Sequence, residues 1–562
     1  MKNANIAALL PEQARTRPEQ LAVLKGLRGA TDYEQLTFSA LDRRSDALAW
    51  GLSAYGISTG TRTLLMVPAG VPLIALTFAL FKIGAAPILI DPAMGRQNLA
   101  VCIAESEPEA MIGIARAHMA RLVFPHVFRT TSRFVTVGRL GWGGATLDEL
   151  EQLGATLHSA YPIAHVRDDD VAAIAFTTGS TGVPKGVVYE HGMFQAQCAL
   201  LHDFYGIAPG EIEMPAFPLF ALFNVALGVT SAIPPIDPTR PAACDPAEVI
   251  AFIKDHSVTS TFGSPAIWAK VTAYCCDYGI TLPTLQRVLM AGAPVPIAIH
   301  ARFADILEPS AQTYTPYGAT EALPVASISG REVLRAHAER NDPTAGTCIG
   351  WPVPNVALRI IAISDAPIAH WDDNLVLPHG QIGEIVVRGP MVTKTYLNRS
   401  QSTALAKIAD HGVIWHRMGD LGYLDTQERL WFYGRKSQRV ETAGGRLFTE
   451  PVELVFQQHP NVFRAALVGV GGEIQNSKFK TQNSKLKMQP VVVIEPVTGK
   501  FPQSPAERDR FMRELQEIAA RYPMTANIRT ILFHPSFPVD IRHNAKIFRE
   551  QLAVWAEKAR TG

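Results

Sequence analysis

Short apolar runs alternate with amphipathic segments along most of this chain. Runs of four to seven residues that are apolar on both faces predict buried strands. They include residues 62–67, 87–90, 171–176, 286–290 and 384–388. Segments with the helical spacing of apolar residues lie between them, for example at 40–55 and 246–256. This alternation predicts an α/β fold with largely parallel sheets.

The longest apolar stretch runs from residue 71 to residue 90. Lys82 lies within it, and Gly84 and Pro87 interrupt it, whereas a membrane-spanning helix needs about 20 predominantly apolar residues. A buried helix over residues 73–83, followed by the strand at 87–90, accounts for the stretch better. We therefore expect no membrane span.

Length and composition indicate a globular protein of more than one domain. The chain has 562 residues, of which 47% are hydrophobic and 18% are charged, and single cores stop growing beyond about 250–300 residues. The formal net charge is only +1, from 52 basic and 51 acidic residues. The overall charge therefore points to no nucleic-acid partner and no anionic membrane, while a local basic groove stays open.

Cysteine usage and the N-terminus favour a cytoplasmic location. The six cysteines include no CxxC pair and no Cys/His cluster with zinc spacing, which is the usage of a reducing compartment in a chain this long. Residues 1–15 have only a short apolar run, because Pro11, Glu12 and Arg15 follow at once. A signal peptide has a longer apolar run.

A polar, glycine-containing segment at 434–445 separates the long α/β region from the C-terminal part. It predicts a large domain at 1–434 and a small domain at 435–562, within the usual size range of domains. The segment 475–488 reads QNSKFKT followed by QNSKLKM. Two copies are too few for a coiled coil, so the repeat predicts an inserted, solvent-exposed basic loop. A contact surface for an acidic partner is the alternative.

A loop rich in glycine and hydroxyl side chains follows the apolar run 171–176. Residues 177–186 read TTGSTGVPKG. Small residues let backbone N–H groups converge on phosphate oxygens, the hydroxyls add donors and the lysine adds positive charge. The order differs from the GxxxxGK[ST] pattern of Walker A loops. The candidate phosphate-binding residues are Thr177, Thr178, Gly179, Ser180, Thr181, Gly182 and Lys185.

This loop resembles the phosphate loop of the adenylate-forming superfamily, which includes acyl-CoA synthetases, the adenylation domains of peptide synthetases and luciferases. Further motifs of that family follow in the same order, and the resemblance covers roughly residues 10–555. It implies a ligase that uses ATP and Mg²⁺ to couple a small carboxylic acid to AMP and releases pyrophosphate. It also implies a large multi-sheet N-terminal domain joined by a hinge to a small, mobile α+β domain.

The second family motif is YTPYGATE at residues 314–321. By resemblance, Tyr317 and Gly318 line the adenine and Thr320 contacts phosphate. Glu321 would hold Mg²⁺, a hard cation that prefers oxygen ligands. The neighbouring Ala319 and an adenine-flanking loop complete this part of the expected nucleotide site. That loop consists of Gly292, Ala293 and Pro294.

Two further motifs imply ribose contacts and a catalytic lysine. Asp420, within MGDLG at 418–422, resembles the aspartate that accepts both ribose hydroxyls in strong charge-assisted bonds. Arg435 resembles an arginine that contacts ribose and begins the hinge. Lys546 resembles the C-terminal lysine that stabilises the adenylation transition state. The candidate catalytic residues are Lys546, Glu321 and Thr320.

Several positions depart from the family pattern. Ser437 stands where most members have an Asp or Lys pivot, and Ala545 stands where most have Gly. The other departures are Glu441, Pro451 and Ala221. They put transfer to CoA in question and leave the ATP site intact. The segment 383–390 with Tyr396 matches a family motif that we interpret as structural.

Four segments are most similar to one branch of the family, the olefin-pathway β-lactone synthetases: 217–223, 237–241, 434–440 and 541–547. By resemblance, the chain adenylates a 3-hydroxy fatty acid, whose own hydroxyl displaces AMP to close a four-membered lactone. Such intramolecular attack needs no second substrate. The alternatives are a ligase that uses CoA or a carrier protein, a stand-alone peptide-synthetase adenylation unit and a non-catalytic nucleotide-binding scaffold. Association with other pathway enzymes stays open.

The expected acid pocket is long and apolar. Phe217, Phe220, Phe223 and the run 261–268 are candidate walls, but aromatic residues in such patterns are equally expected in the core. His191 matches a family position near the nucleotide, and a packing role is equally expected. The sequence assigns no base for lactone closure.

Overall fold

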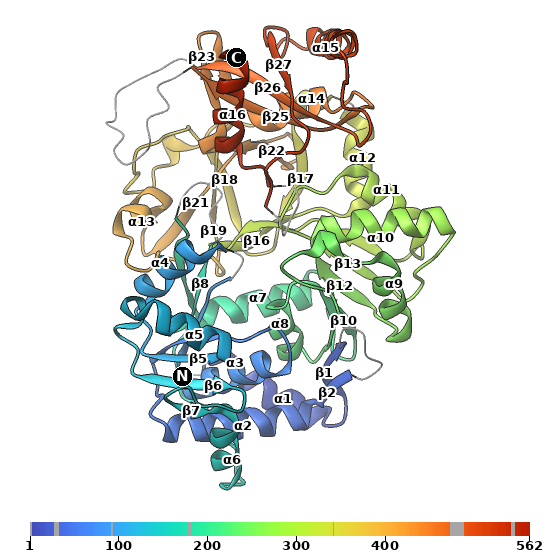
Figure 1. The fold of residues 1–562 in the computed structure, drawn as a ribbon. Coiled ribbons are helices and arrows are strands. Elements are labelled where there is room, and N and C mark those ends of the chain that lie inside the picture. Colours follow the sequence, from blue (N-terminus) through green and yellow to red (C-terminus); the bar gives the residue numbers. More distant parts are fainter. Residues whose placement is uncertain are drawn as a thin grey trace.

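The computed structural model of the chain describes residues 3–26, 33–91, 94–177, 183–340, 342–471, 488–540 and 546–561. Two mainly parallel sheets with their helices form one end of the molecule. A small C-terminal sheet forms the other end. An antiparallel sheet lies in the middle, between the parallel sheets and this C-terminal sheet (Figure 1). The predicted fold class, a large multi-sheet α/β part followed by a small α+β part, is confirmed.

The first parallel sheet has the strand order β7-β6-β5-β3-β4-β8-β9. Only β8 and β9 run antiparallel to each other. The predicted strands at 62–67, 87–90 and 171–176 are confirmed within it. The strands are β3 (Arg62–Met66), β4 (Ala86–Leu89), β5 (Ala110–Ile114), β6 (Arg133–Val137), β7 (Ala145–Thr146), β8 (Val171–Phe176) and β9 (Gly186–Glu190).

The second sheet has the order β14-β13-β12-β10-β11-β1-β2 and is parallel except for the edge pair β1 and β2. The predicted strand at 286–290 is confirmed as β13. The strands are β1 (Leu21–Gly26), β2 (Tyr33–Thr37), β10 (Ile212–Pro215), β11 (Thr230–Ile233), β12 (Ser260–Gly263), β13 (Arg287–Met290) and β14 (Gln312–Tyr314). Ligands of such sheets bind beyond the carboxyl ends of the strands, where residues 177 and 291–294 lie.

The third sheet is antiparallel, with the order β15-β16-β17-β22-β21-β19-β18 and β20 beside β21. The strand predicted at 384–388 exists as β19, but the expectation of a parallel sheet is wrong here. Antiparallel strands need no crossover helix between them and can be joined by a short turn, as β21 and β22 are. The strands are β15 (Tyr317–Ala319), β16 (Ala322–Ser327), β17 (Thr347–Pro352), β18 (Ala357–Ile361), β19 (Gly383–Arg388), β20 (Lys407–Asp410), β21 (Val413–Leu424) and β22 (Leu430–Arg435).

The helices cover the sheets, and those predicted at 40–55, 73–83 and 246–256 are confirmed as α2, α3 and α9. Several begin at a capping side chain followed by proline, as α10 does at Ser264. The helices of the large part are α1 (Leu9–Thr16), α2 (Phe38–Ala54), α3 (Val71–Ile83), α4 (Arg96–Ser106), α5 (Ala115–Val123), α6 (Leu147–Ala155), α7 (His191–Asp203), α8 (Phe220–Ala226), α9 (Pro246–Asp255), α10 (Pro265–Tyr278), α11 (Ile297–Ile306), α12 (Gly330–Arg340) and α13 (Ser400–Ala406).

Helix α3 carries a fully buried lysine. Lys82 is inaccessible to solvent, and its Nζ lies 2.6 Å from a carboxylate oxygen of both Asp42 and Asp46 on α2. Two carboxylates supply the charge compensation that a buried ammonium requires. Within the described residues, no helix is long and apolar enough to cross a membrane.

The C-terminal part contains a sheet of its own, in which β25 (Val462–Val470) pairs antiparallel with β26 (Gln489–Pro496) and β26 pairs parallel with β27 (Thr530–Phe533). The remaining elements here are β23 (Val440–Thr442), β24 (Gly445–Leu447), α14 (Thr449–Phe456), α15 (Pro505–Ala520) and α16 (Arg549–Thr561). Of the predicted insert at 475–488, all but Met488 lies outside the described residues. The boundary between 434 and 435 stays a prediction.

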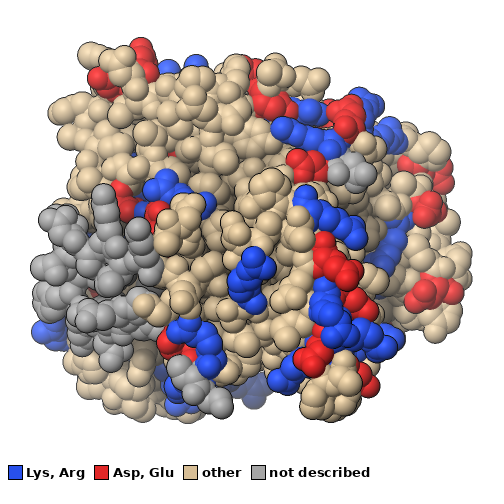
Figure 2. Space-filling model, turned by 90° about the horizontal axis from the view of Figure 1, so that it is seen from above, with Lys and Arg blue, Asp and Glu red and all other residues tan. Residues whose placement is uncertain are grey.

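From above this end of the molecule, acidic and basic side chains are interspersed (Figure 2). This mixture accords with the near-zero net charge of the whole chain, +1.

Candidate active site

A cavity of about 2970 Å³ lies where the carboxyl ends of the parallel sheets, the antiparallel sheet and the C-terminal part meet. It brings together the site residues that the sequence predicts, as far as they are described. Residues 178–182 of the phosphate loop lie outside the described residues. The predicted residues that line the cavity are Thr177, Lys185, Gly292, Ala293, Pro294, Tyr317, Gly318, Ala319, Thr320, Glu321, Asp420, Arg435 and Lys546.

Hydrogen bonds join Thr177 and Lys185, which lie at the two ends of the phosphate loop. The Thr177 backbone N–H donates to the Lys185 carbonyl at 3.0 Å, and the Lys185 N–H donates to Thr177 Oγ1 at 3.3 Å. These two bonds close the base of the loop between β8 and β9.

Asp420 forms the centre of a buried polar group on the antiparallel sheet. It lies opposite Arg435 in the β21–β22 ladder, and only 2% of it is exposed. Tyr317 donates its hydroxyl to Asp420 Oδ2 at 2.6 Å, and Arg435 Nη1 lies 2.9 Å from Oδ1. Beyond this ion pair, Oδ1 accepts no hydrogen bond of good geometry from a described residue. An unused acceptor on a buried carboxylate suits a hydroxyl donor such as that of a ribose.

Burial and the neighbouring positive charge have opposite effects on the pKa of the Asp420 carboxyl. Burial raises the pKa of the Asp420 carboxyl, and Arg435 and the Tyr317 hydroxyl oppose the rise. The neighbouring carboxylate raises the pKa of the Arg435 guanidinium. Burial, together with Asp420, holds the pKa of the Tyr317 phenol well above its usual value. The phenol therefore stays a donor to Asp420.

Glu321 is oriented by a tyrosine from a distant part of the chain. Tyr396 donates its hydroxyl to Glu321 Oε1 at 2.6 Å. The Glu321 carbonyl accepts from both the N–H (2.9 Å) and the Oγ1 (3.0 Å) of Thr393. Among the described residues, none donates to Glu321 Oε2. Glu321 lines the cavity, so this oxygen is available to a ligand.

Two lysines surround the tyrosine that holds Glu321. Lys185 Nζ lies 4.8 Å and Lys407 Nζ lies 5.8 Å from the centre of the Tyr396 ring. Lys407 is buried and donates to the carbonyl of Thr393. Burial lowers the pKa of Lys407 to about 7, and Glu321 opposes the shift. Lys185 lines the cavity and places a positive charge near Glu321, as negative phosphates require.

His416 adds a neutral imidazole at this end. Its Nδ1 lies 3.2 Å from the carbonyl of Ala406, so Nδ1 must carry the proton. Burial and the neighbouring Lys407 hold the pKa of His416 well below its usual value. The side chain lines the cavity. The imidazole is therefore uncharged.

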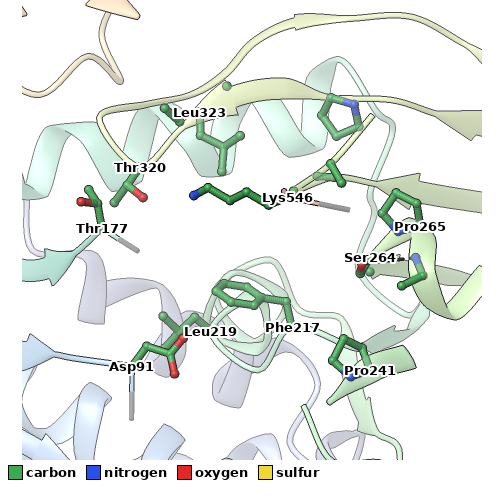
Figure 3. Close-up of a pocket in the computed structure, with 18 of the residues that line it drawn as sticks. Asp91, Thr177, Phe217, Leu219, Pro241, Ser264, Pro265, Thr320, Leu323 and Lys546 are labelled. Carbon is green, nitrogen blue, oxygen red and sulfur yellow. Dashed lines mark hydrogen bonds between the residues drawn. The ribbon is translucent and has the colours of Figure 1, made fainter. Parts of the chain in front are cut away.

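Lys546 extends from the C-terminal part into the cavity. Its side chain points toward Thr320 and Thr177 in Figure 3. The backbone carbonyl of Lys546 accepts from the N–H of Asp540 at 2.9 Å, and Val539 forms a bridge with Ile547. The preceding departure, Ala545, lies outside the described residues. The structure thus brings Lys546 to the same cavity as the N-terminal site residues.

The cavity continues into an apolar region. Phe217 and Phe223 line it, as do residues 262–266. Phe220 instead stacks on Phe262 with ring centres 4.3 Å apart, and Trp268 is fully buried in the core. Of the candidate walls, Phe217, Phe223 and Phe262 therefore face the cavity, whereas Phe220 and Trp268 are packing residues. Ala221, one of the departures, is also buried in the core.

His191 lies away from the cavity. It is inaccessible to solvent, and its Nδ1 accepts from the backbone N–H of Ile6 at 3.4 Å. Burial lowers the pKa of its imidazole to about 4. The ring lies edge-on to Phe81. Packing is therefore the role that the structure supports for this histidine.

The segment after Arg435 is tied to the large part by ion pairs. Lys436 Nζ lies 2.9 Å from Glu384, whose other oxygen is 2.7 Å from Arg417. Arg439 pairs with Asp365. The departure Ser437 lies between these two anchored residues. Glu384 and Arg417 are each 1% exposed in their side chains, so the predicted structural role of the segment 383–390 is consistent with this contact.

Other contacts join α14 and α16 to the rest of the chain. Thr347 on β17 donates to Glu450 at 2.5 Å, and burial raises the pKa of Glu450 to about 7. Arg549 pairs with Glu453 at 2.7 Å and donates to Gln438 at 3.1 Å. The departure Pro451 is buried on the same helix, and Glu441 pairs with Arg439 and Arg446.

Sequence reasoning missed the groups that surround Glu321. Tyr396 was interpreted as structural, yet it contacts a predicted site residue 75 positions away. Tyr189 donates to the carbonyl of Thr320, 131 positions away. Lys407 lies on β20 and His416 lies on β21, the strand of Asp420, but neither belongs to a motif that resembles the family. The spacing of these residues in the sequence does not predict their contacts, because the contacts form only when the sheets pack together.

The family described as AMP-binding enzyme matches residues 10–397. The olefin beta-lactone synthetase of Stenotrophomonas maltophilia is 49% identical over 98% of this chain and 98% of its own length. The olefin beta-lactone synthetase of Xanthomonas campestris is 46% identical over 99% of this chain and 98% of its own. The ATP-bound MatB structure from Rhodopseudomonas palustris is 17% identical, with a TM-score of 0.76 over 99% of this chain and 100% of that one. That structure shares the fold.

Proposed function

The chain belongs to the AMP-binding enzyme family, and we propose that it activates a 3-hydroxy fatty acid with ATP and closes the product to a β-lactone. Similarity along almost the whole chain to two olefin beta-lactone synthetases carries this proposal. The cavity supports it, because one end presents cations and a buried ribose-type acceptor and the other end is apolar. An acid with a long apolar tail and a nucleotide would meet between the two ends.

In the first step, a carboxylate oxygen of the acid attacks the α-phosphorus of ATP. A phosphorus–oxygen bond forms, the bond to the bridging oxygen breaks, and pyrophosphate leaves with that electron pair. We assign the ribose to Asp420 and Arg435, and the triphosphate to the phosphate loop with Lys185. Lys546 points toward the phosphate end, where its ammonium would stabilise the charge that develops at the α-phosphate.

The residues present fit one Mg²⁺ ion that is shared with ATP. Among the described residues, no cluster of three or more His, Cys, Asp or Glu side chains could hold a metal, and Mg²⁺ commonly binds one or two carboxylates plus substrate phosphates. We assign that role to Glu321, whose Oε2 is available while Tyr396 fixes Oε1. Bound there, Mg²⁺ would neutralise phosphate charge.

In the second step, the 3-hydroxyl oxygen attacks the carbonyl carbon of the acyl-adenylate. A carbon–oxygen bond forms, the bond from the carbonyl carbon to the phosphate oxygen breaks, AMP leaves with that electron pair, and the hydroxyl proton passes to water. Both reacting groups belong to one molecule, so positioning replaces a second substrate. The ion pairs of Lys436 and Arg439 are in keeping with a hinge that need not turn between the steps.

We further propose the site assignments above, the domains 1–434 and 435–562, and a cytoplasmic location. Gly434 supports a hinge at this point, since its φ of +109° lies in the region that favours glycine. CoA or a carrier protein is the alternative acceptor of the acyl group, and association with other enzymes of a pathway is compatible with this assignment.

The deciding experiment is mass spectrometry of the products formed from ATP, Mg²⁺ and a racemic 3-hydroxy fatty acid, with and without CoA. A CoA-independent product one water lighter than the acid, with the ring confirmed by infrared spectroscopy or NMR, is expected. The matched acid without the 3-hydroxyl should release pyrophosphate and give no such product. Acyl-CoA formed only in the presence of CoA, without lactone, would refute ring closure and assign thioester formation instead.

A further inference from the structure

Helix α5 turns its larger apolar side chains toward solvent. Met119, Leu122 and Val123 are 50%, 63% and 68% exposed, whereas Ala117 and His118 form the buried side. A surface helix of a globular protein normally buries its apolar stripe and exposes its polar residues. The order is reversed here, so packing within this chain does not explain the apolar side of α5.

The apolar surface extends beyond the helix. Phe124, directly after α5, is 38% exposed, and Leu140 in the neighbouring loop is 69% exposed. Arg121 joins the helix to that loop, because its Nη2 donates to the carbonyl of Trp142 at 2.6 Å. We call Met119, Leu122, Val123 and Phe124 the α5 face. Contiguous exposed apolar groups of this kind mark contact sites.

The surrounding charges are all positive in sequence. No acidic residue occurs between Glu109 and Asp148, whereas this stretch contains five arginines. Arg116 and Arg139 are exposed, and neither forms an ion pair with a described residue. The near-zero net charge of the chain thus conceals a local basic surface beside the α5 face.

The α5 face also borders the cavity of the candidate active site. Met119, Val123 and Phe124 are among the cavity-lining residues, and so is Arg116. A cavity that opens beside exposed apolar side chains lets a water-insoluble molecule pass without crossing a polar rim. This continuity connects the surface with the apolar end of the cavity.

We propose that the α5 face, with Arg116 and Arg139, docks on a lipid bilayer that contains anionic headgroups. Apolar side chains on one side of a helix, flanked by unpaired arginines, are typical of helices that lie in the membrane interface. The arginines face the headgroup phosphates while Leu122 and Val123 enter the acyl boundary. Docking itself does not depend on the proposed reaction. If that reaction holds, the acid enters the cavity directly from lipid.

The test is co-sedimentation of the full chain with vesicles of phosphatidylglycerol and phosphatidylcholine, and with vesicles of phosphatidylcholine alone. We expect binding to the anionic vesicles that weakens with salt. The double variant Leu122→Ser/Val123→Ser should lower the partition coefficient about tenfold or more, since two apolar side chains no longer enter the bilayer. Arg116→Glu/Arg139→Glu should abolish the preference for anionic vesicles. Circular dichroism melts check that each variant is folded.

Matched controls lie far from α5. Tyr278→Ser on α10 removes a side chain that is also 68% exposed, and Arg508→Glu on α15 reverses an exposed charge. Both should bind vesicles as the unaltered chain does. The proposal is overturned if the unaltered chain does not sediment with anionic vesicles above its background without vesicles. It is equally overturned if the α5 variants bind like the controls, or if they instead dissociate an oligomer in size-exclusion chromatography, which would assign the face to a second copy or a protein partner.

Discussion

The substitution Asp420→Asn tests the nucleotide site most directly. Asn has nearly the same shape as Asp, so the side chain should fit the same buried space. It removes the negative charge that lies 2.9 Å from Arg435 Nη1 and replaces one acceptor oxygen with an amide donor. A ribose hydroxyl that would donate to Oδ1 then faces another donor. We therefore expect weaker productive binding of ATP.

The size of the loss follows from the hydrogen bonds involved. Hydrogen bonds to charged groups contribute about 1.5–3 kcal/mol each, and each 1.36 kcal/mol is tenfold in rate. Loss of one such bond should lower kcat/KM for ATP by about 10- to 150-fold. Tyr317→Phe is the matched control, because it removes the 2.6 Å hydrogen bond to Oδ2 and keeps the charge. Its effect on kcat/KM for ATP should be smaller than that of Asp420→Asn, because the charge and the acceptor Oδ1 stay in place.

The assay is ATP–pyrophosphate exchange, measured over a range of ATP concentrations and repeated with 2′-deoxy-ATP. The unaltered enzyme should prefer ATP, and Asp420→Asn should lose most of that preference, because the residue that reads the hydroxyl has changed. A thermal melt by circular dichroism shows whether the variant is folded. The reasoning is refuted if folded Asp420→Asn keeps kcat/KM for ATP within about threefold of the parent, or discriminates against 2′-deoxy-ATP as the parent does.

The remaining predictions concern Lys546, the buried Lys407 and the buried ion pairs of Lys82. Lys546→Ala should slow ATP–pyrophosphate exchange by several orders of magnitude with ATP binding nearly intact; a loss below about tenfold, or about 1.4 kcal/mol, would exclude a role in adenylation. Burial lowers the pKa of Lys407 to about 7 from its ordinary 10.5, so the unfolded chain binds more protons between these values and stability should rise with pH there, by up to about 1.4 kcal/mol per pH unit. Lys407→Met should flatten that rise in urea unfolding, and unchanged profiles would contradict the shift. Asp46→Ala leaves the ammonium of Lys82 with one carboxylate instead of two, and should lower the free energy of unfolding by about 3 kcal/mol; a loss below about 1 kcal/mol would show that the ion pair is dispensable.

Elements with a local cause could be predicted from the sequence. The run 171–176 is apolar on both faces, and it forms β8 with the same bounds. The apolar run 384–388 predicts a strand for the same reason. It does not predict that the neighbouring strands are antiparallel, because an apolar run does not indicate the direction of the strands beside it. The candidate site could be predicted where motifs carry it, as at Glu321, Asp420 and Lys546. All three line one cavity.

What the sequence by itself determined was the family, the order of the elements and the residue types that meet a nucleotide. These depend on patterns within short stretches of sequence, which are independent of how the rest of the chain packs. Only the tertiary structure decided that Tyr396 holds Glu321, that Tyr317 lies on Asp420 from 103 positions away, and that α5 turns its apolar side outward. Each depends on which surfaces pack together, and burial or exposure of a side chain is a property of that packing and not of its neighbours in sequence.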